Sequence, residues 1–84
     1  MKNADLEYFH TQLPTLIADK YDVVESTALE LMTEWEGKTK EATKELGMGE
    51  EEFVTVLKNN YSRYITNPET SVLNDFLESH LNGS

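Results

Sequence analysis

The side chains that could do chemistry in this 84-residue chain are mostly carboxylates: it has 16 Asp plus Glu, two histidines and no cysteine. The absence of cysteine excludes a disulfide framework, a thiolate zinc site and a cysteine nucleophile. His10 and His80 lie near opposite ends of the chain, and neither belongs to a motif typical of a catalytic base or a metal ligand. We therefore expect no catalytic residue, no metal site and no cofactor, and we expect that the protein is not an enzyme.

Two segments come near known ligand-binding motifs but lack essential parts of them. The segment LGMG at 46–49 has two glycines, without the preceding strand or the lysine that a phosphate-binding loop needs. The segment DKYDVVESTALE at 19–30 begins and ends on acidic residues, but it lacks the central glycine of a calcium-binding EF-hand loop. Neither segment predicts a phosphate or calcium site.

The acidic residues are concentrated in the middle of the chain. The formal net charge is -9, and residues 41–52 alone hold five acidic residues and one lysine. A field of this sign repels phosphate backbones and attracts basic protein surfaces. Trp35, between two glutamates, would suit an Arg-rich partner through cation–π contact, although a tryptophan at helical spacing is more often a core residue. The predicted partner-binding residues are Glu34, Trp35, Glu36, Glu41, Glu45, Glu50, Glu51 and Glu52.

The elements that must position these residues are helices, because apolar residues recur at helical spacing and no alternating run is bounded by hairpin turns. We expect an all-α bundle of five or six short helices in a single domain covering residues 1–84, since two cores would each be too small. The first helix should begin after Asn3 as N-cap, and Pro14 should start a second helix. A third should open at 25–26 and either stop near Gly37 or continue as one bent helix to Gly47.

The C-terminal third predicts two more helices. One runs from about Glu50 to Ile65, and the other begins at Pro68 with Asn67 as its cap and leaves residues 81–84 frayed. The helical spacing of apolar residues in each segment predicts the members of the core. These are Leu16, Ile17, Leu31, Met32, Phe53, Leu57, Tyr61, Phe76 and Leu77.

A weak internal repeat at an offset of 25 residues suggests two helix-turn-helix units. IADKYDVVESTALELM from Ile17 aligns with ATKELGMGEEEFVTVL from Ala42, so that Asp22 and Gly47 occupy equivalent turn positions. A DNA-reading unit places its second helix in the major groove, and affinity comes largely from neutralised phosphates. The segment from Val24 to Trp35 has no Lys or Arg. We therefore expect no direct binding to duplex DNA.

Three functional hypotheses remain. The first is a small acidic protein-binding module that modulates or inhibits a basic partner, including one that binds nucleic acid. The second is a helix-turn-helix transcription regulator, and the third is a structural or assembly subunit that pairs through its last helix, for instance as a homodimer. The apolar runs are too short for a membrane span, and the N-terminal segment has acids where a signal peptide would need an apolar core. We therefore expect no membrane association and a cytoplasmic location.

Overall fold

The computed structural model describes residues 4–81, which form four α-helices and one short 3-10 helix and contain no strand. The helices are α1 (Ala4–Tyr21), α2 (Glu25–Glu45), α3 (Glu50–Thr66), the 3-10 helix η1 (Pro68–Thr70) and α4 (Val72–Leu81). The all-helical prediction is confirmed, but five or six α-helices was too many. The predicted cap Asn3 and residues 82–84 of the predicted frayed end lie outside the described residues, whereas Leu81 is the last residue of α4.

The first reason for the smaller number is that α1 continues through Pro14. An interior proline removes the hydrogen bond to the carbonyl four residues earlier and costs about 3 kcal/mol relative to alanine. Leu13 and Ile17, on either side of it, are fully buried on the same helix face. Packing on both sides of the proline therefore holds one helix together. Leu16 consequently points away from the core and is 48 % exposed, so its predicted burial was wrong.

The second reason is that α2 passes through Gly37 as one helix of 21 residues. Its end is the one the sequence predicted: Gly47 has a left-handed backbone with φ 79°. The N–H of Gly47 donates to the Lys44 carbonyl at 3.0 Å, and that of Met48 donates to the Thr43 carbonyl at 2.9 Å. This pair of bonds is the Schellman motif, which satisfies the last carbonyls of a helix.

The two turns aligned by the internal repeat share a backbone conformation. Asp22, between α1 and α2, has φ 58°, and Gly47 has φ 79° at the equivalent position between α2 and α3. Among the described residues these are the two with positive φ. The predicted correspondence of the turns is therefore present in the backbone, with a non-glycine residue in the strained conformation at the first turn.

The beginning of the last helix differs from the prediction. Pro68 starts the short η1 instead of α4, and Ser71 follows with extended backbone at φ -91° and ψ 133°. The N–H of Leu73 donates to Ser71 Oγ at 3.2 Å, which is the N-cap hydrogen bond of α4. Ser71 Oγ in turn donates to the Asn60 carbonyl of α3 at 3.2 Å. The cap is therefore a buried serine that also attaches α4 to α3, in place of the predicted Asn67.

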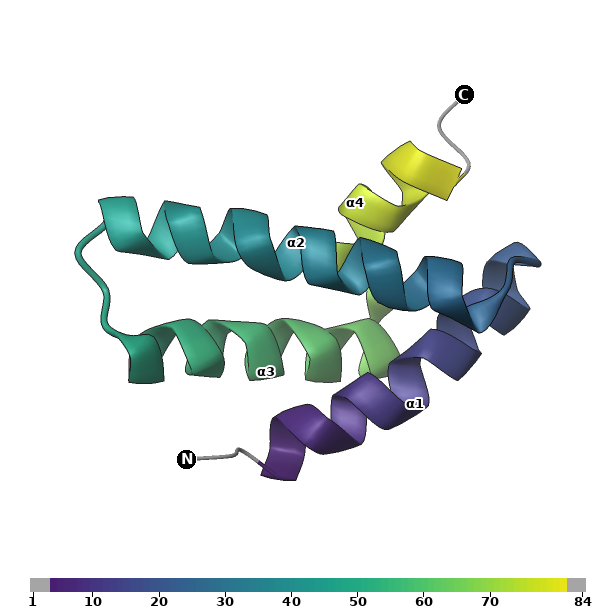
Figure 1. The fold of residues 1–84 in the computed structure, drawn as a ribbon, viewed down its shortest axis with the longest axis horizontal. Helices are drawn as coiled ribbons and strands as arrows, with labels where there is room; N and C mark the ends of the chain where they lie inside the picture. Colours follow the sequence, from purple (N-terminus) through teal and green to yellow (C-terminus); the bar gives the residue numbers. More distant parts are fainter. Residues whose placement is uncertain (1–3, 82–84) are drawn as a thin grey trace.

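The helices α2 and α3 run antiparallel as a hairpin, with the connecting turn at one end (Figure 1). At the opposite end α1 crosses the hairpin, and α4 extends away beside it, so the turn end reaches well beyond α4 (Figure 1). The half of the hairpin that contains the turn is therefore not covered by α4.

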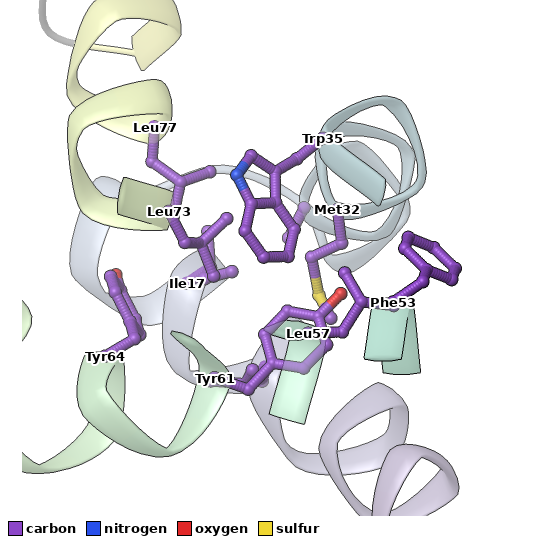
Figure 2. Close-up of a cluster of buried hydrophobic side chains, with 11 residues drawn as sticks. Ile17, Met32, Trp35, Phe53, Leu57, Tyr61, Tyr64, Leu73 and Leu77 are labelled. Atoms are coloured by element: carbon purple, nitrogen blue, oxygen red, sulfur yellow. The ribbon is translucent and has the colours of Figure 1, made fainter. Parts of the chain in front are cut away.

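The core lies where the four helices meet. Figure 2 shows Trp35 of α2 directed toward Leu73 and Leu77 of α4, with Tyr61 of α3 below it. Six predicted core residues are buried there, while Leu31 and Phe76 are half-buried and pack against its edge. The buried apolar residues of this core are Leu13, Ile17, Ala28, Met32, Trp35, Phe53, Leu57, Tyr61, Tyr64, Leu73 and Leu77.

Candidate functional site

Five of the predicted partner-binding residues lie around the turn end of the α2–α3 hairpin. Glu41 and Glu45 are exposed in the last turns of α2, and Glu50, Glu51 and Glu52 are exposed in the first turn of α3. Carboxylates in that first turn also meet the positive end of the helix dipole. The tertiary structure therefore gathers these five acids at one end of the molecule, and we call them the turn-end acids.

Two of the turn-end acids also have local structural contacts. Glu52 Oε1 accepts a hydrogen bond from the Gly49 N–H at 3.1 Å, which satisfies a backbone donor at the start of α3. Glu50 Oε1 lies 3.9 Å from Lys40 Nζ, and both side chains are well exposed. An exposed ion pair of this kind contributes little to stability, so Glu50 stays accessible to another cation.

The remaining predicted acids lie elsewhere and have other contacts. Glu36 is half-buried; its Oε2 lies 2.5 Å from His10 Nε2 and accepts a hydrogen bond from the Tyr61 hydroxyl. These contacts join α2 to α1 and α3, so Glu36 belongs to the packing of the bundle. Glu34 is exposed, and its Oε2 lies 3.3 Å from His80 Nε2 on α4. The structure thus separates Glu34 and Glu36 from the turn-end acids.

Trp35 is a core residue. Its side chain is 4 % exposed, and its ring centroid lies 5.3 Å from that of Tyr61 with the two planes tilted by 52°. The interpretation of Trp35 as a core residue is confirmed. Its ring does not stand exposed between the two neighbouring glutamates. Trp35 is also one of the residues that line the groove between α2, α3 and α4.

Two tyrosine hydroxyls donate hydrogen bonds to carboxylates on neighbouring helices. Burial, and then the hydrogen bond to Glu36, raise the pKa of Tyr61 above its ordinary value. Burial, followed by the hydrogen bond to Glu78 at 2.5 Å, likewise raises the pKa of Tyr21. Both phenols therefore stay neutral where an exposed tyrosine would ionise, which makes them structural donors.

An apolar groove of about 710 Å³ lies between α2, α3 and α4. We call it the α2–α4 groove. Its walls carry the apolar side chains Leu46 and Val72, which are 77 % and 59 % exposed. The full lining is Trp35, Lys38, Thr39, Ala42, Thr43, Leu46, Met48, Val56, Asn60, Val72, Asp75, Phe76 and Ser79.

Two of the turn-end acids, Glu51 and Glu52, lie in a hollow that adjoins this groove. That smaller hollow shares Met48 and Val56 with the groove. Asp75 lies in the groove lining itself. An apolar surface between acidic side chains presents the two features that a basic amphipathic partner would match.

The sequence pattern indicated the acids but not the groove. The last helix has an apolar stripe that includes Val72 and Phe76. Phe76 was predicted as core, and the same helix was also considered as a surface that pairs with another chain. In the structure Leu73 and Leu77 take the buried side of α4, while Val72 and Phe76 face the groove. The signal was present in the width of the stripe, which is broader than one contact face of a short helix needs.

Comparison with protein-family models, with curated proteins and with solved structures found no match. Within residues 4–81, no group of three or more His, Asp or Glu side chains is placed to hold a metal ion. In the same part of the chain, no helix has the length and apolar character that crossing a membrane requires. The candidate site therefore rests on the geometry and charge of the α2–α4 groove.

Proposed function

We propose that this protein is a small, non-enzymatic module that binds a basic protein partner and thereby modulates or inhibits it. The observation that carries the proposal is the exposed apolar α2–α4 groove with acidic side chains along it. Apolar surface supplies the affinity of an interface, and complementary charge supplies association rate and selectivity. Both occur here on the same side of the α2–α3 hairpin.

The charge of the whole chain supports the same function. With a net charge of -9, the protein attracts cationic surfaces over a distance of about one Debye length, roughly 8 Å at physiological salt. The groove lining itself holds only two ionisable side chains, Lys38 and Asp75, and neither histidine. This composition favours docking of a protein surface over proton-transfer chemistry.

The helix-turn-helix alternative receives no support from the exposed face of α2. The residues that would face DNA from the first half of this helix are all exposed, and they include no Lys or Arg. These residues are Glu25, Ser26, Leu29, Glu30, Thr33 and Glu34. Duplex DNA is therefore not part of the proposal, and a salt-sensitive, sequence-specific complex in an anisotropy titration would contradict this exclusion.

The proposal is tested by capturing partners and then measuring how fast they associate. Purified protein on a support is exposed to cell lysate, and the proteins that salt releases are identified, purified and tested individually. Glu51→Lys with Asp75→Lys reverses one acid of the adjoining hollow and one acid of the groove lining without removing the Glu52 cap. Asp19→Lys with Glu30→Lys is the matched control, because both residues are exposed, outside the groove lining, and give the same change in net charge.

We expect the first variant to slow association by about tenfold at low salt and to flatten its salt dependence. The control should slow association by about twofold or threefold, through net charge alone. A partner that associates equally fast with both variants would show that the acids beside the groove do not steer it. A set of released proteins with no basic members would contradict the proposal itself.

A further inference from the structure

We propose that the α2–α4 groove receives one amphipathic α-helix of the partner, with its apolar face on the groove and basic residues along its flanks. This inference rests on the proposed function and names the form that the partner takes there. The observation behind it is that three helices, α2, α3 and α4, supply the walls of one open, apolar hollow.

The shape of the site favours a helix over an extended segment. Extended peptides bind chiefly by adding a strand to the edge of a sheet, where backbone hydrogen bonds supply the affinity. Residues 4–81 contain no strand, so an extended segment would find no such edge. A helix satisfies its own backbone hydrogen bonds and packs on other helices at about 8–10 Å between axes. Its apolar side chains could then contact Leu46 on one wall and Val72 on the other.

The charge of the site favours a basic helix. Asp75 lies in the lining, and Glu51 and Glu52 lie in the adjoining hollow, against Lys38 as the single base of the lining. Lys or Arg on the flanks of the helix would pair with these carboxylates, while an acidic flank would be repelled. The same charges disfavour a second copy of this chain as the occupant, since each copy carries a net charge of -9.

The chain has a reporter for this groove, because its single tryptophan, Trp35, borders it. The probe is a fluorescein-labelled peptide of about 18 residues without aromatic side chains, with Leu at i, i+3, i+4 and i+7 and Lys on the flanks. A second peptide has the same sequence except for two central prolines, which break the helix. A third has Glu in place of every Lys. Binding is measured by the fluorescence anisotropy of each labelled peptide, at the same peptide concentration, as protein is added. Trp35 emission is measured separately as unlabelled peptide is added.

The protein variants are Leu46→Asp and Leu29→Asp. Both leucines are on or next to α2, both are substantially exposed, and both substitutions add one negative charge. Only Leu46 lines the groove. Because an added negative charge should by itself attract a basic peptide, weaker binding by Leu46→Asp would report the lost apolar contact.

We expect the basic helical peptide to bind and to shift Trp35 emission. Leu46→Asp should weaken its binding about tenfold, and Leu29→Asp should weaken it less than about twofold. Equal binding of the proline peptide would overturn the helix inference and leave the basic-partner proposal standing. Tighter binding of the Glu peptide would overturn both. Equal effects of the two variants, or no saturable binding, would show that the groove is not the site. A dimer in sedimentation that Leu46→Asp dissociates would assign the groove to a second copy instead.

Discussion

Two glycines in the α2–α3 hairpin should respond in opposite ways to the same substitution. Gly37 lies in the interior of α2, is exposed, and has no atom within 4 Å of the place where a Cβ would stand. Glycine in a helix interior costs about 1 kcal/mol relative to alanine, because glycine has more conformational entropy in the unfolded chain and loses it when the helix forms. Gly37→Ala should therefore increase the free energy of unfolding by about 1 kcal/mol.

Gly47 also has open space around its Cβ position, but its φ is 79°. An L-residue in this left-handed conformation is strained by roughly 1–2 kcal/mol. Alanine also restricts the unfolded chain, which offsets part of that cost. We expect Gly47→Ala to decrease the free energy of unfolding by about 1 kcal/mol, so the two variants should differ by about 2 kcal/mol. In a chain of this length each kcal/mol corresponds to a shift in Tm of about 4–8 °C.

Urea unfolding followed by far-ultraviolet circular dichroism measures both changes, with the denaturant dependence checked for equal slopes. Asp22→Gly is a third arm, because Asp22 has φ 58° at the equivalent turn and glycine relieves that conformation. It should increase the free energy of unfolding by about 0.5–1 kcal/mol. Changes of the same sign for Gly37→Ala and Gly47→Ala would refute the assignment of Gly37 to a helix interior and of Gly47 to a left-handed cap.

Three further predictions concern the core and the caps. Ser71→Ala should decrease the free energy of unfolding by about 1–2 kcal/mol, since it removes the cap of α4 and the hydrogen bond to the Asn60 carbonyl. The control Ser62→Ala, at an exposed serine, should change the free energy of unfolding by less than about 0.5 kcal/mol in the same urea titration. Ile17→Ala should cost about 2–5 kcal/mol and Leu16→Ala less than about 1 kcal/mol, and equal costs would contradict a continuous α1 with Leu16 outside. The pKa of Tyr61 is raised in the folded state. Its contribution to the free energy of unfolding is therefore complete below about pH 10, where an unfolded tyrosine still holds its proton, and is lost as the pH rises above that value. The difference in stability between the wild type and Tyr61→Phe should therefore shrink between about pH 10 and 11.5, by up to roughly 1.4 kcal/mol per pH unit; a constant difference would show that the two states of Tyr61 titrate alike.

The turns and helix ends illustrate where local sequence was sufficient. Gly47 was identified as the end of α2, and the alignment of Asp22 with Gly47 matched a shared left-handed backbone. A left-handed cap depends on the residue itself and on hydrogen bonds within six positions along the chain, so a local pattern contains the information needed.

Pro14 and Ser71 illustrate where local sequence misled. A proline favours the first turn of a helix, yet at Pro14 the buried side chains of Leu13 and Ile17 hold the helix through it. Asn67-Pro68 has the pattern of a cap, yet the carbonyl of Asn60 and the core position of Leu73 make Ser71 the cap of α4. In both places a tertiary contact worth a few kcal/mol exceeds a local preference of similar or smaller size.

The sequence by itself determined that the described chain is helical, which residues give most of the core, and that the acids concentrate in 41–52. Helical spacing and charge are properties of neighbouring residues, and each of these features follows from them. Only the tertiary structure decided which acids stand together. The turn places the end of α2 and the start of α3, with their acids, at one end of the hairpin, while His10, Tyr61 and His80 hold Glu36 and Glu34 elsewhere. The tertiary structure also decided that Val72 and Phe76 line a groove, Phe76 at the edge of the core, since a helix of 10 residues beside a longer hairpin covers only part of it.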